Sequence, residues 1–468
     1  MLHQTWATPL HDTTWSTPAV INRHREDPIV VLGDNSGAVH AIDATTGAVR
    51  WVHRTDIGVN AHPVPVDIDG DGIEEVLIGS LDSTLYVLRS EDGSIVWKYL
   101  SGGSIRVKPA VGKVNGRQVV GFMAYDHAFY TLDLQTGRLL WKKSIPNHPI
   151  TANKGFSKGC VSSPVLFDVN RDGTPEFVFA TRNKRVFALN AATGELVWHV
   201  RVYYDPDSSP SLAIMDGEVI VVVGAGEALS ARGDNRMLGI DGRTGRVRWA
   251  YRAGGALDSS PTIAHLTPDS GLVAVEGSLK DGALYAVNAS DGKLMWRFQT
   301  GGECCCEQDE NDVCVYPDRS CKVYATPLIF EQNGKSIVVF GNNDHMLFVL
   351  DGASGEPLEI LETPGIVRSS PVMATIDGQS AVFVGCGAYL CRFDGFDVDF
   401  EWPMYKGDLA NTGMAYTPTP ITPAAPSAFW KRWNQFDMLL ATYGVDSLLY
   451  VIYQLEKRLK IRLLPYTY

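Results

Sequence analysis

The chain has 468 residues, of which 45% are hydrophobic and 20% charged, as in an ordinary globular protein. Its formal net charge of −12 excludes a nucleic-acid backbone as the main partner, because proteins that bind nucleic acid present concentrated Lys and Arg. No apolar run follows Met1, so we expect a cytoplasmic protein if Met1 is the native start, and a periplasmic or extracellular one if this is a mature chain.

Residues 1–15 form a leader without a complete repeat, and the chain then repeats one pattern eight times, with openings 44 to 66 residues apart. Each repeat opens with a residue pair ending in Pro: Thr17-Pro18, His62-Pro63, Lys108-Pro109, Ser163-Pro164, Ser209-Pro210, Ser260-Pro261, Thr326-Pro327 and Ser370-Pro371. Most repeats close with Trp: Trp51, Trp97, Trp141, Trp198, Trp249, Trp296 and, less regularly, Trp402. A turn ending in Gly, such as Asp43–Gly47, precedes each closing strand, and Gly there takes the positive φ that the turn requires.

Each repeat holds four short apolar segments separated by turns, which predicts four antiparallel strands. Eight such units are typical of an all-β fold, an eight-bladed β-propeller over residues 16–413. The leader is a candidate for closing the ring. We expect each closing Trp to fill the gap between adjacent blades, because its large apolar ring gains most from burial.

The repeat pattern resembles a known family. It is similar to propeller repeats of the pyrroloquinoline-quinone (PQQ) type. The matching pattern is Ser-Pro, then V-x-V-G, then L-Y-A-x-[DN]-x-x-[TD]-G-x-x-x-W, as in Leu284–Trp296. The resemblance covers about residues 16–413 and implies the propeller fold. The family includes quinoprotein dehydrogenases and the propeller lipoprotein of the outer-membrane barrel-assembly machine, so the resemblance implies either an enzyme or a binding protein.

One end of the predicted propeller collects the variable features. In a four-strand meander, the Ser-Pro openings and the turns between second and third strands share one end, which we call the funnel end. Three long insertions fall there: Ser144–Val161, Ala225–Arg236 and Gln299–Val323. Loops that grow on a rigid scaffold usually carry function, so we expect the binding site at this end.

The residue three before each opening Pro should line this funnel, and His62 and Lys108 replace the Ser or Thr found just before Pro elsewhere. Charged and polar groups around a cavity suit an anionic or zwitterionic ligand, or alternatively pair with one another in a solvated funnel. The predicted funnel residues are Trp15, Asn60, His62, Arg106, Lys108, Asp207, Asp258, Tyr324 and Arg368.

Two turns between first and second strands share the pattern D-x-[DN]-x-D-G-x-x-E. Oxygen ligands at alternate positions, a Gly and a closing Glu suit Ca²⁺, so we predict a structural calcium site in each loop, with an Asx turn without metal as the alternative. The ligands would be Asp67, Asp69, Asp71 and Glu75 in one loop, and Asp168, Asn170, Asp172 and Glu176 in the other.

Seven of the eight cysteines are expected near the funnel end: Cys160, Cys304, Cys305, Cys306, Cys314, Cys321 and Cys386. They could form disulfides that staple a long loop, a thiolate site for a metal or redox group, or inert thiols. Quinoprotein dehydrogenases carry a vicinal Cys pair beside the quinone, and Cys304–Cys306 is similar to it. No catalytic residue of that family can be assigned to a position here.

A Pro/Thr-rich linker over 414–426 leads to a segment, 427–468, whose apolar residues follow helical spacing in two stripes. We predict a basic amphipathic helical hairpin, without a membrane span because Asp446 interrupts its apolar run. It would dock on a protein partner, lie on a membrane surface or pack on its own propeller. The docking residues would be Trp430, Trp433, Phe436, Leu440, Leu448, Ile452, Leu455 and Leu459.

These features favour a non-catalytic binding scaffold that uses the funnel and the C-terminal helices to hold a protein partner. The alternative is an oxidoreductase that depends on PQQ or on a thiolate-bound metal and uses the funnel with the Cys304–Cys321 loop.

Overall fold

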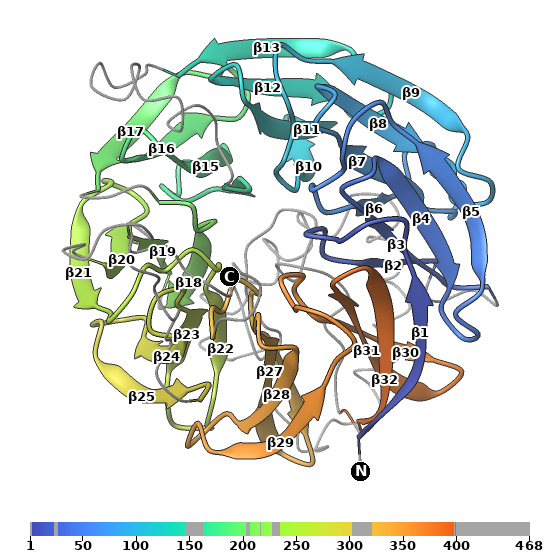
Figure 1. The fold of residues 1–468 in the computed structure, drawn as a ribbon. Coiled ribbons are helices and arrows are strands. Elements are labelled where there is room, and N and C mark those ends of the chain that lie inside the picture. The colour runs from blue at the N-terminus through green and yellow to red at the C-terminus, as the bar shows by residue number, and fades with distance from the viewer. Residues whose placement is uncertain are drawn as a thin grey trace, which may run out of the picture. The chain divides into compact units, whose positions relative to one another are not determined.

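The computed structural model describes residues 2–22, 27–145, 162–202, 206–215, 217–226, 235–301, 321–396 and 398. These residues form eight four-stranded antiparallel sheets arranged as the blades of a ring (Figure 1), which confirms the predicted eight-bladed propeller. The predicted helical hairpin and its docking residues lie outside the described residues. Within the described part, no helix is long and apolar enough to cross a membrane.

The first four blades take their strands in chain order, from the central strand outward. Blade 1 contains β2 (Ala19–Ile21), β3 (Ile29–Gly33), β4 (Ala38–Asp43) and β5 (Val49–Arg54); blade 2 contains β6 (Val64–Val66), β7 (Glu75–Gly79), β8 (Thr84–Leu88) and β9 (Ile95–Leu100). Blade 3 contains β10 (Ala110–Val114), β11 (Arg117–Ala124), β12 (Ala128–Asp133) and β13 (Leu139–Ser144); blade 4 contains β14 (Val165–Phe167), β15 (Glu176–Thr181), β16 (Arg185–Asn190) and β17 (Leu196–Arg201).

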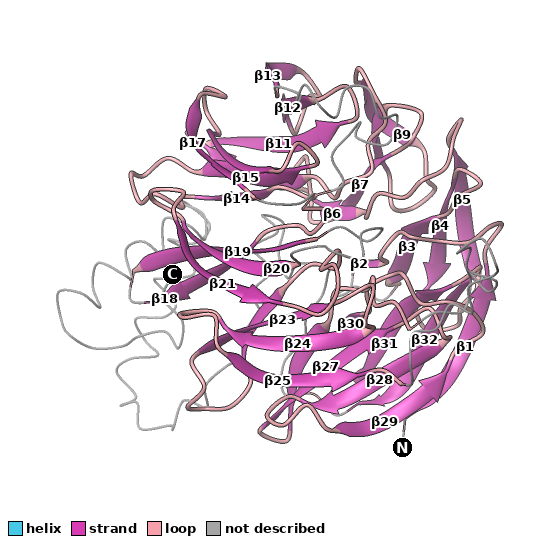
Figure 2. Cartoon of the chain, turned by 60° about the vertical axis from the view of Figure 1, so that its left-hand side comes forward, coloured by secondary structure: helices cyan, strands magenta, loops and turns pink. Residues whose placement is uncertain are grey.

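Blades 5 to 7 repeat this order, and Figure 2 shows the strands of each blade side by side with loops at their ends. Blade 5 contains β18 (Ser211–Met215), β19 (Glu218–Ala225), β20 (Arg236–Asp241) and β21 (Val247–Arg252); blade 6 contains β22 (Thr262–His265), β23 (Leu272–Gly277), β24 (Ala283–Asn288) and β25 (Leu294–Gln299). Blade 7 contains β26 (Leu328–Gln332), β27 (Lys335–Gly341), β28 (Met346–Asp351) and β29 (Pro357–Glu362).

Blade 8 is built from both ends of the propeller. It contains β30 (Val372–Ile376), β31 (Gln379–Cys386) and β32 (Tyr389–Phe396), and its fourth strand is β1 (His3–Pro9). Trp402, predicted to close this blade, lies outside the described residues. Trp6 of β1 takes the closing position instead, because the N-terminal strand pairs antiparallel with β32.

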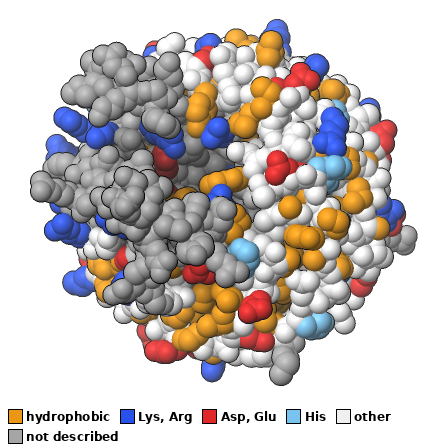
Figure 3. Space-filling model, viewed as in Figure 1, with side chains coloured by type: hydrophobic (Ala, Val, Ile, Leu, Met, Phe, Trp, Pro, Cys, Tyr) orange, Lys and Arg blue, Asp and Glu red, His pale blue; other side chains and the backbone are white. Residues whose placement is uncertain are grey.

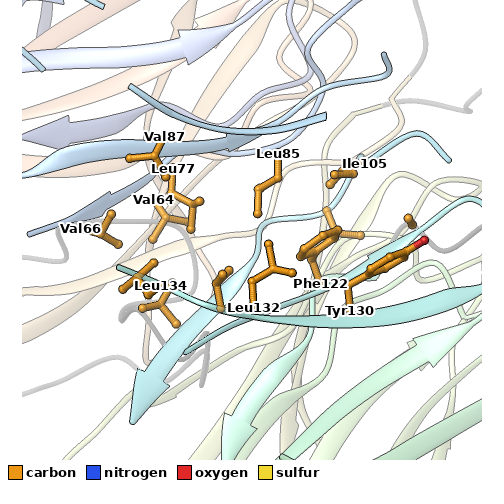
Figure 4. Packing of buried hydrophobic residues seen from close by; sticks show 14 of the residues in the cluster. Val64, Val66, Leu77, Leu85, Val87, Ile105, Phe122, Tyr130, Leu132 and Leu134 are labelled. Atoms are coloured by element: carbon orange, nitrogen blue, oxygen red, sulfur yellow. The ribbon is translucent and has the colours of Figure 1, made fainter. Parts of the chain in front are cut away.

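Hydrophobic clusters fill the spaces between adjacent blades. The cluster in Figure 4 combines Val64, Leu77 and Leu85 of blade 2 with Phe122 and Leu132 of blade 3, all of them fully buried. The second and third strands are buried along nearly their whole length, as in β7 and β8. Both faces of a blade therefore pack on neighbours, which explains why these strands read as continuous apolar runs.

A tryptophan joins the outer strand to the next blade in seven of the eight blades, and only β29 of blade 7 has none. In blade 4, the Trp198 indole N–H donates a hydrogen bond of 2.7 Å to the Gly242 carbonyl of blade 5. Gly245 in the same turn has a φ of +69°, and a Cβ placed there would lie 2.9 Å from the indole ring. The same arrangement recurs at Trp6, Trp51, Trp97, Trp141, Trp249 and Trp296.

A β-bulge beside each of these tryptophans sets its direction. In blade 4, Ala188 pairs with Trp198 while the adjacent Leu189 pairs with Leu196, so Val197 is left out of the register. A bulge increases the local twist of the outer strand and re-aims its side chains. The closing Trp thereby turns toward the neighbouring blade.

We expect Trp198→Ala to lower the free energy of unfolding by roughly 3–5 kcal/mol, because it leaves a cavity between blades 4 and 5. Trp198→Phe should cost less, since it keeps a ring and loses only the bond to Gly242. Denaturant unfolding followed by tryptophan-independent far-UV circular dichroism measures both. A loss below about 0.5 kcal/mol for Trp198→Ala, within the range of surface substitutions, would contradict the wedge role.

Candidate functional site

The residues just before each opening Pro form a chain of hydrogen bonds around the funnel. The backbone N–H of Ser163 donates to the Ser209 hydroxyl at 2.9 Å, and Ser209 N–H donates to the Ser260 hydroxyl at 3.0 Å. The chain continues with Ser260 to Thr326 at 3.1 Å, Thr326 to Ser370 at 2.9 Å and Ser370 to Thr17 at 3.1 Å. A short hydroxyl side chain at this position thus links neighbouring blades at six of the eight places, and we call this chain the Ser-Pro ring.

His62 and Lys108, the two exceptions to the Ser/Thr rule, occupy neighbouring places in the Ser-Pro ring. The Thr17 N–H donates to His62 Nδ1 at 2.7 Å, so the imidazole replaces a hydroxyl as acceptor. The Lys108 N–H donates to the Ser163 hydroxyl at 3.0 Å, but an ammonium group cannot accept a hydrogen bond from the preceding blade. The Lys108 side chain is completely buried rather than lining an open funnel.

The residue three before each Pro reaches solvent while its neighbours do not. In the seven blades where this position is described, the residue is partly or fully exposed, and the residues immediately before and after it are buried. The position therefore points away from the blade packing. Its occupants are Trp15, Asn60, Arg106, Asp207, Asp258, Tyr324 and Arg368.

Three of these residues form an aromatic cluster around a guanidinium group. The Arg368 guanidinium carbon lies 4.4 Å from the Trp15 ring centre and 5.6 Å from that of Tyr324. The two rings meet edge to face with centroids 5.3 Å apart. Arg368 Nε also donates a hydrogen bond of 3.3 Å to Asn343 Oδ1. Cation–π contact and this bond hold the side chain in one place, and we call the three residues the Arg368 cluster.

Charged residues from further blades adjoin this cluster. Burial raises the pKa of Tyr324, the Arg368 charge acts against this rise, and the negative charges of Asp258 and Asp207 add to it. Electrostatic contact of this kind requires proximity, so Asp207 of blade 5 and Asp258 of blade 6 lie near the Arg368 cluster.

Arg182 is a funnel residue that the sequence analysis missed. It forms a two-pronged ion pair with Asp207, with Nε and Nη2 at 2.8 and 2.6 Å from the two carboxylate oxygens. This pair raises the pKa of Arg182, burial opposes the rise, and Tyr125 and Asp258 add to it. Arg106 in turn lies over the Tyr125 ring at 5.0 Å. Arg182 and Tyr125 come from turns between second and third strands, and comparing those turns across repeats could have revealed them.

Asn60 contributes an unsatisfied polar atom. Its Oδ1 is buried and has no hydrogen-bond partner among the described residues. Buried polar atoms are usually paired, by protein or by water, so an isolated acceptor here suits a site that binds something with a donor group.

The two predicted calcium loops fold alike. Asp67 accepts hydrogen bonds from the Gly70 and Gly72 N–H groups at 2.7 and 3.0 Å, and the Asp67, Asp69 and Asp71 carboxylates lie within 4.8 Å of one another. In the second loop, Asp168 and Asn170 accept bonds from the Asp172 N–H at 3.1 and 2.8 Å.

The closing glutamates of these loops are buried. Burial raises the pKa of Glu176 to about 8, a hydrogen bond from the Val169 N–H opposes the rise, and Asp168 and Asp172 add to it. Burial likewise raises the pKa of Glu75. Carboxylates held by loop N–H groups are the feature of an Asx turn, and the same oxygens suit Ca²⁺. The structural Ca²⁺ stays a prediction for both loops.

The described cysteines fall into two kinds. Cys321 is disulfide-bonded. Cys386 and Cys391 are free and completely buried, and burial together with the neighbouring Cys391 raises the pKa of the Cys386 thiol well above its usual value. A buried protonated thiol is a poor metal ligand. The other predicted cysteines, Cys160, Cys304, Cys305, Cys306 and Cys314, lie outside the described residues.

Eight four-stranded blades, Gly-backed tryptophan wedges and Ser-Pro openings define a β-propeller of the PQQ type. A family model described as "Outer membrane protein assembly factor BamB" matches residues 4–181 and 182–385. The chain belongs to this family of PQQ-type propellers.

The curated relatives include both assembly factors and dehydrogenases. The chain is 22% identical over 235 residues to outer membrane protein assembly factor BamB of Yersinia pestis, covering 49% of this chain and 56% of that protein. It is 22% identical over 325 residues to a polyvinylalcohol dehydrogenase of a Pseudomonas species, covering 56% of this chain and 48% of the enzyme. The chain thus spans about half the length of these relatives.

The similar solved structures also include an assembly factor and a dehydrogenase. BamB of Moraxella catarrhalis matches with a TM-score of 0.56 and 16% identity, covering 84% of this chain and 98% of that one. The quinohemoprotein alcohol dehydrogenase of Comamonas testosteroni matches with a TM-score of 0.58 and 16% identity, covering 89% and 78%. Identities this low establish the shared fold alone.

We expect the folding stability of the protein to fall in acid because of His62. Burial and the nearby Lys108 charge lower the pKa of His62 from 6.5 to about 3. The unfolded chain therefore binds a proton more tightly than the folded one, and stability is lost as pH falls from about 6.5 toward 3. The predicted loss at pH 5 is about 2 kcal/mol.

We expect His62→Ser, which retains an acceptor as in other blades, to reduce this acid sensitivity. The measurement is the unfolding free energy between pH 7.5 and 4.5, compared as a slope so that packing losses cancel. The exposed His3→Ser is the matched control and should follow the wild type. Identical slopes for wild type and His62→Ser would disprove the assignment.

Proposed function

We propose that the chain is a non-catalytic scaffold that holds a protein partner, and that the funnel binds a segment of this partner. The family match and the similarity to BamB proteins, which their names describe as assembly factors, support a binding role. On the face drawn in Figure 3, hydrophobic side chains lie among acidic and basic ones. Mixed surfaces of this kind suit protein partners.

The observation that carries this proposal is the Arg368 cluster. Trp, Tyr and Arg are the residue types that contribute most to binding at protein interfaces. Here all three lie together, and their contacts with one another and the bond from Arg368 to Asn343 fix them before a partner arrives. Side chains ordered in advance lose little conformational entropy on binding, so more of the contact energy appears as affinity.

The charged side chains at this site indicate the chemistry of the partner segment that would bind there. Arg182 and Asp207 already satisfy each other through two hydrogen bonds. A guanidinium stacked on aromatic rings suits a carboxylate, while the rings suit an apolar side chain. A segment that carries an acidic residue or a C-terminal carboxylate beside an apolar residue would match the Arg368 cluster.

A second attachment is the predicted helical hairpin over 427–468, which we propose anchors the same partner or complex. Its basic charge and two apolar stripes support this role. We also propose an oxidising compartment, periplasmic or extracellular. The disulfide at Cys321 supports it, because such bonds persist outside the cytosol.

The alternative function is a quinone-dependent oxidoreductase, favoured by the similarity to polyvinylalcohol and quinohemoprotein dehydrogenases. In this chain Trp15 offers a flat ring and Arg368 a cation for an anionic planar group. A bound quinone would supply the capacity to accept two electrons from a substrate. Its near-ultraviolet and visible absorbance in the purified protein separates this function from the scaffold.

Arg368→Ala and Trp15→Ala should each weaken partner binding about 10- to 100-fold, because each removes part of a central anchor. The measurement is quantitative mass spectrometry of proteins that co-purify from a lysate of the source organism. Lys293→Ala, which changes an exposed cation on an outer turn of blade 6, is the control and should retain the same proteins. Equal recovery with all three variants would refute binding at the funnel.

Deleting Ser427–Tyr468 should leave a folded propeller but lose the partner in the same assay, since the strands of all eight sheets come from residues that precede this segment. Far-UV circular dichroism and thermal unfolding report the fold, and recovery of the partner reports the anchor. Unchanged recovery would remove the anchoring role of the C-terminal helices while leaving the funnel proposal intact.

A further inference from the structure

Two histidines and an aspartate meet where the chain passes from blade 8 to blade 1. His11 lies in the segment after β1, Asp34 follows β3, and His40 lies within β4. His11 Nδ1 is 3.3 Å from His40 Nε2, and His40 Nε2 is 2.8 Å from Asp34 Oδ2. All three potential ligand atoms lie within 4.8 Å of one another. Sequence analysis missed this group because its members come from three separate elements.

The segment that carries His11 fastens the ring closure, and we call residues 10–14 the closure segment. It bonds to blade 8 through Leu10 N–H to the Ala388 carbonyl at 2.8 Å and Thr14 N–H to the Gly387 carbonyl at 2.9 Å. It bonds to blade 1 through the Thr14 hydroxyl, which donates to the Gly33 carbonyl at 2.7 Å. His11 therefore stands between the first and last blades.

Blade 1 departs from the other blades at His40. The equivalent strand position, judged by register, holds Tyr86, Tyr130 and Tyr285 in blades 2, 3 and 6. Each of these tyrosines donates its hydroxyl to an aspartate of the preceding turn, namely Asp82, Asp126 and Asp281. In blade 1, Ser36 stands in place of that aspartate, Asp34 stands in place of Ser80, and imidazole replaces the phenol. His11 adds a second imidazole.

The site is held in place by its surroundings. Asp34 Oδ1 accepts bonds from the Ser36 N–H at 2.9 Å and the Ser36 hydroxyl at 2.6 Å. Oδ2 contacts His40 Nε2 and accepts bonds from the backbone N–H groups of His11 and Asp12 at 3.1 and 3.2 Å. Asp34 and His40 are buried at 0% and 1% exposure, whereas His11 is exposed. His40 Nδ1 is buried and has no hydrogen-bond partner among the described residues, so Nε2, which contacts Asp34, is the ring atom that ties this imidazole to the site.

We propose that His11, Asp34 and His40 form a binding site for a divalent transition-metal ion of the Zn²⁺ type. Two nitrogens and one carboxylate oxygen, with a further position open to solvent beside His11, match the ligand set of such ions rather than of Ca²⁺ or Mg²⁺. The 3.3 Å between the two ring nitrogens agrees with two ligands about 2.1 Å from one tetrahedral ion, which lie about 3.4 Å apart.

The bound ion would tie the closure segment to blade 1. Because the ligands come from both sides of the closure, binding requires the closed ring and should stabilise it in proportion to RT ln(1 + [M]/Kd). The site is independent of the Arg368 cluster, and its failure would leave the proposed binding function untouched.

The test uses tag-free, metal-stripped full-length protein, since a histidine tag would itself bind the probe. Zn²⁺ is titrated by calorimetry, and Co²⁺ is added in parallel because its visible spectrum distinguishes nitrogen and oxygen ligands from thiolates of the cysteine-rich loop. Wild type should bind one ion with a nitrogen/oxygen spectrum, and its thermal midpoint should rise with Zn²⁺.

Two variants decide the assignment. His11→Ala should weaken this binding at least about 100-fold, and His40→Tyr should do the same while retaining the fold, because other blades carry Tyr at this position. His3→Ala, an exposed histidine on the same N-terminal segment, should bind like wild type. The proposal is overturned if wild type shows no such equivalent, or if His11→Ala and His40→Tyr bind the ions as wild type does.

Discussion

The propeller depends on the hydrogen bonds of the Ser-Pro ring. Each link joins the backbone of one blade to a side chain of the next, so the eight sheets cannot slide independently. Near the centre of a propeller, adjacent strands converge, and a short hydroxyl side chain fits there while still accepting a bond; His62 is the exception, with its imidazole as acceptor. Pro then follows because its fixed φ suits an extended opening and its missing N–H leaves no unsatisfied donor. At the periphery, where blades diverge, the large indole of Trp198 and its equivalents fills the wider gap.

Because the Ser-Pro ring and the tryptophans hold the blades together, one position per repeat is free to vary. The residues next to it are buried, whereas the residue three before Pro is partly or fully exposed in the seven blades where it is described. A change there alters the site without disturbing the sheets. Trp15, Tyr324 and Arg368 can therefore form a cluster although they belong to blades 1, 7 and 8.

The propeller architecture could be predicted from the sequence because the same pattern of strands and turns occurs eight times. Ser-Pro openings, Gly turns and closing tryptophans predicted the blades, and the exceptions His62 and Lys108 marked an unusual place in the Ser-Pro ring. Contacts between repeats were harder. Nothing local indicated that Trp6 rather than Trp402 closes blade 8, that Arg182 pairs with Asp207, or that His11 reaches His40. Each depends on strand order or on the distance between turns, which periodicity does not contain.

The sheet shared by β1 and β32 has a consequence for biosynthesis. Thr5 and Asp394, which are hydrogen-bonded in the finished protein, are separated by 389 positions. At a translation rate of about 5–20 residues per second, roughly 20 to 80 seconds pass between the emergence of the two strands from the ribosome. During that interval the first strand is unpaired and its edge is open, so it can pair with the last blade of another nascent chain. Closing the propeller with its first strand therefore carries a risk of domain-swapped dimers. This risk grows as nascent chains become more crowded on a polysome.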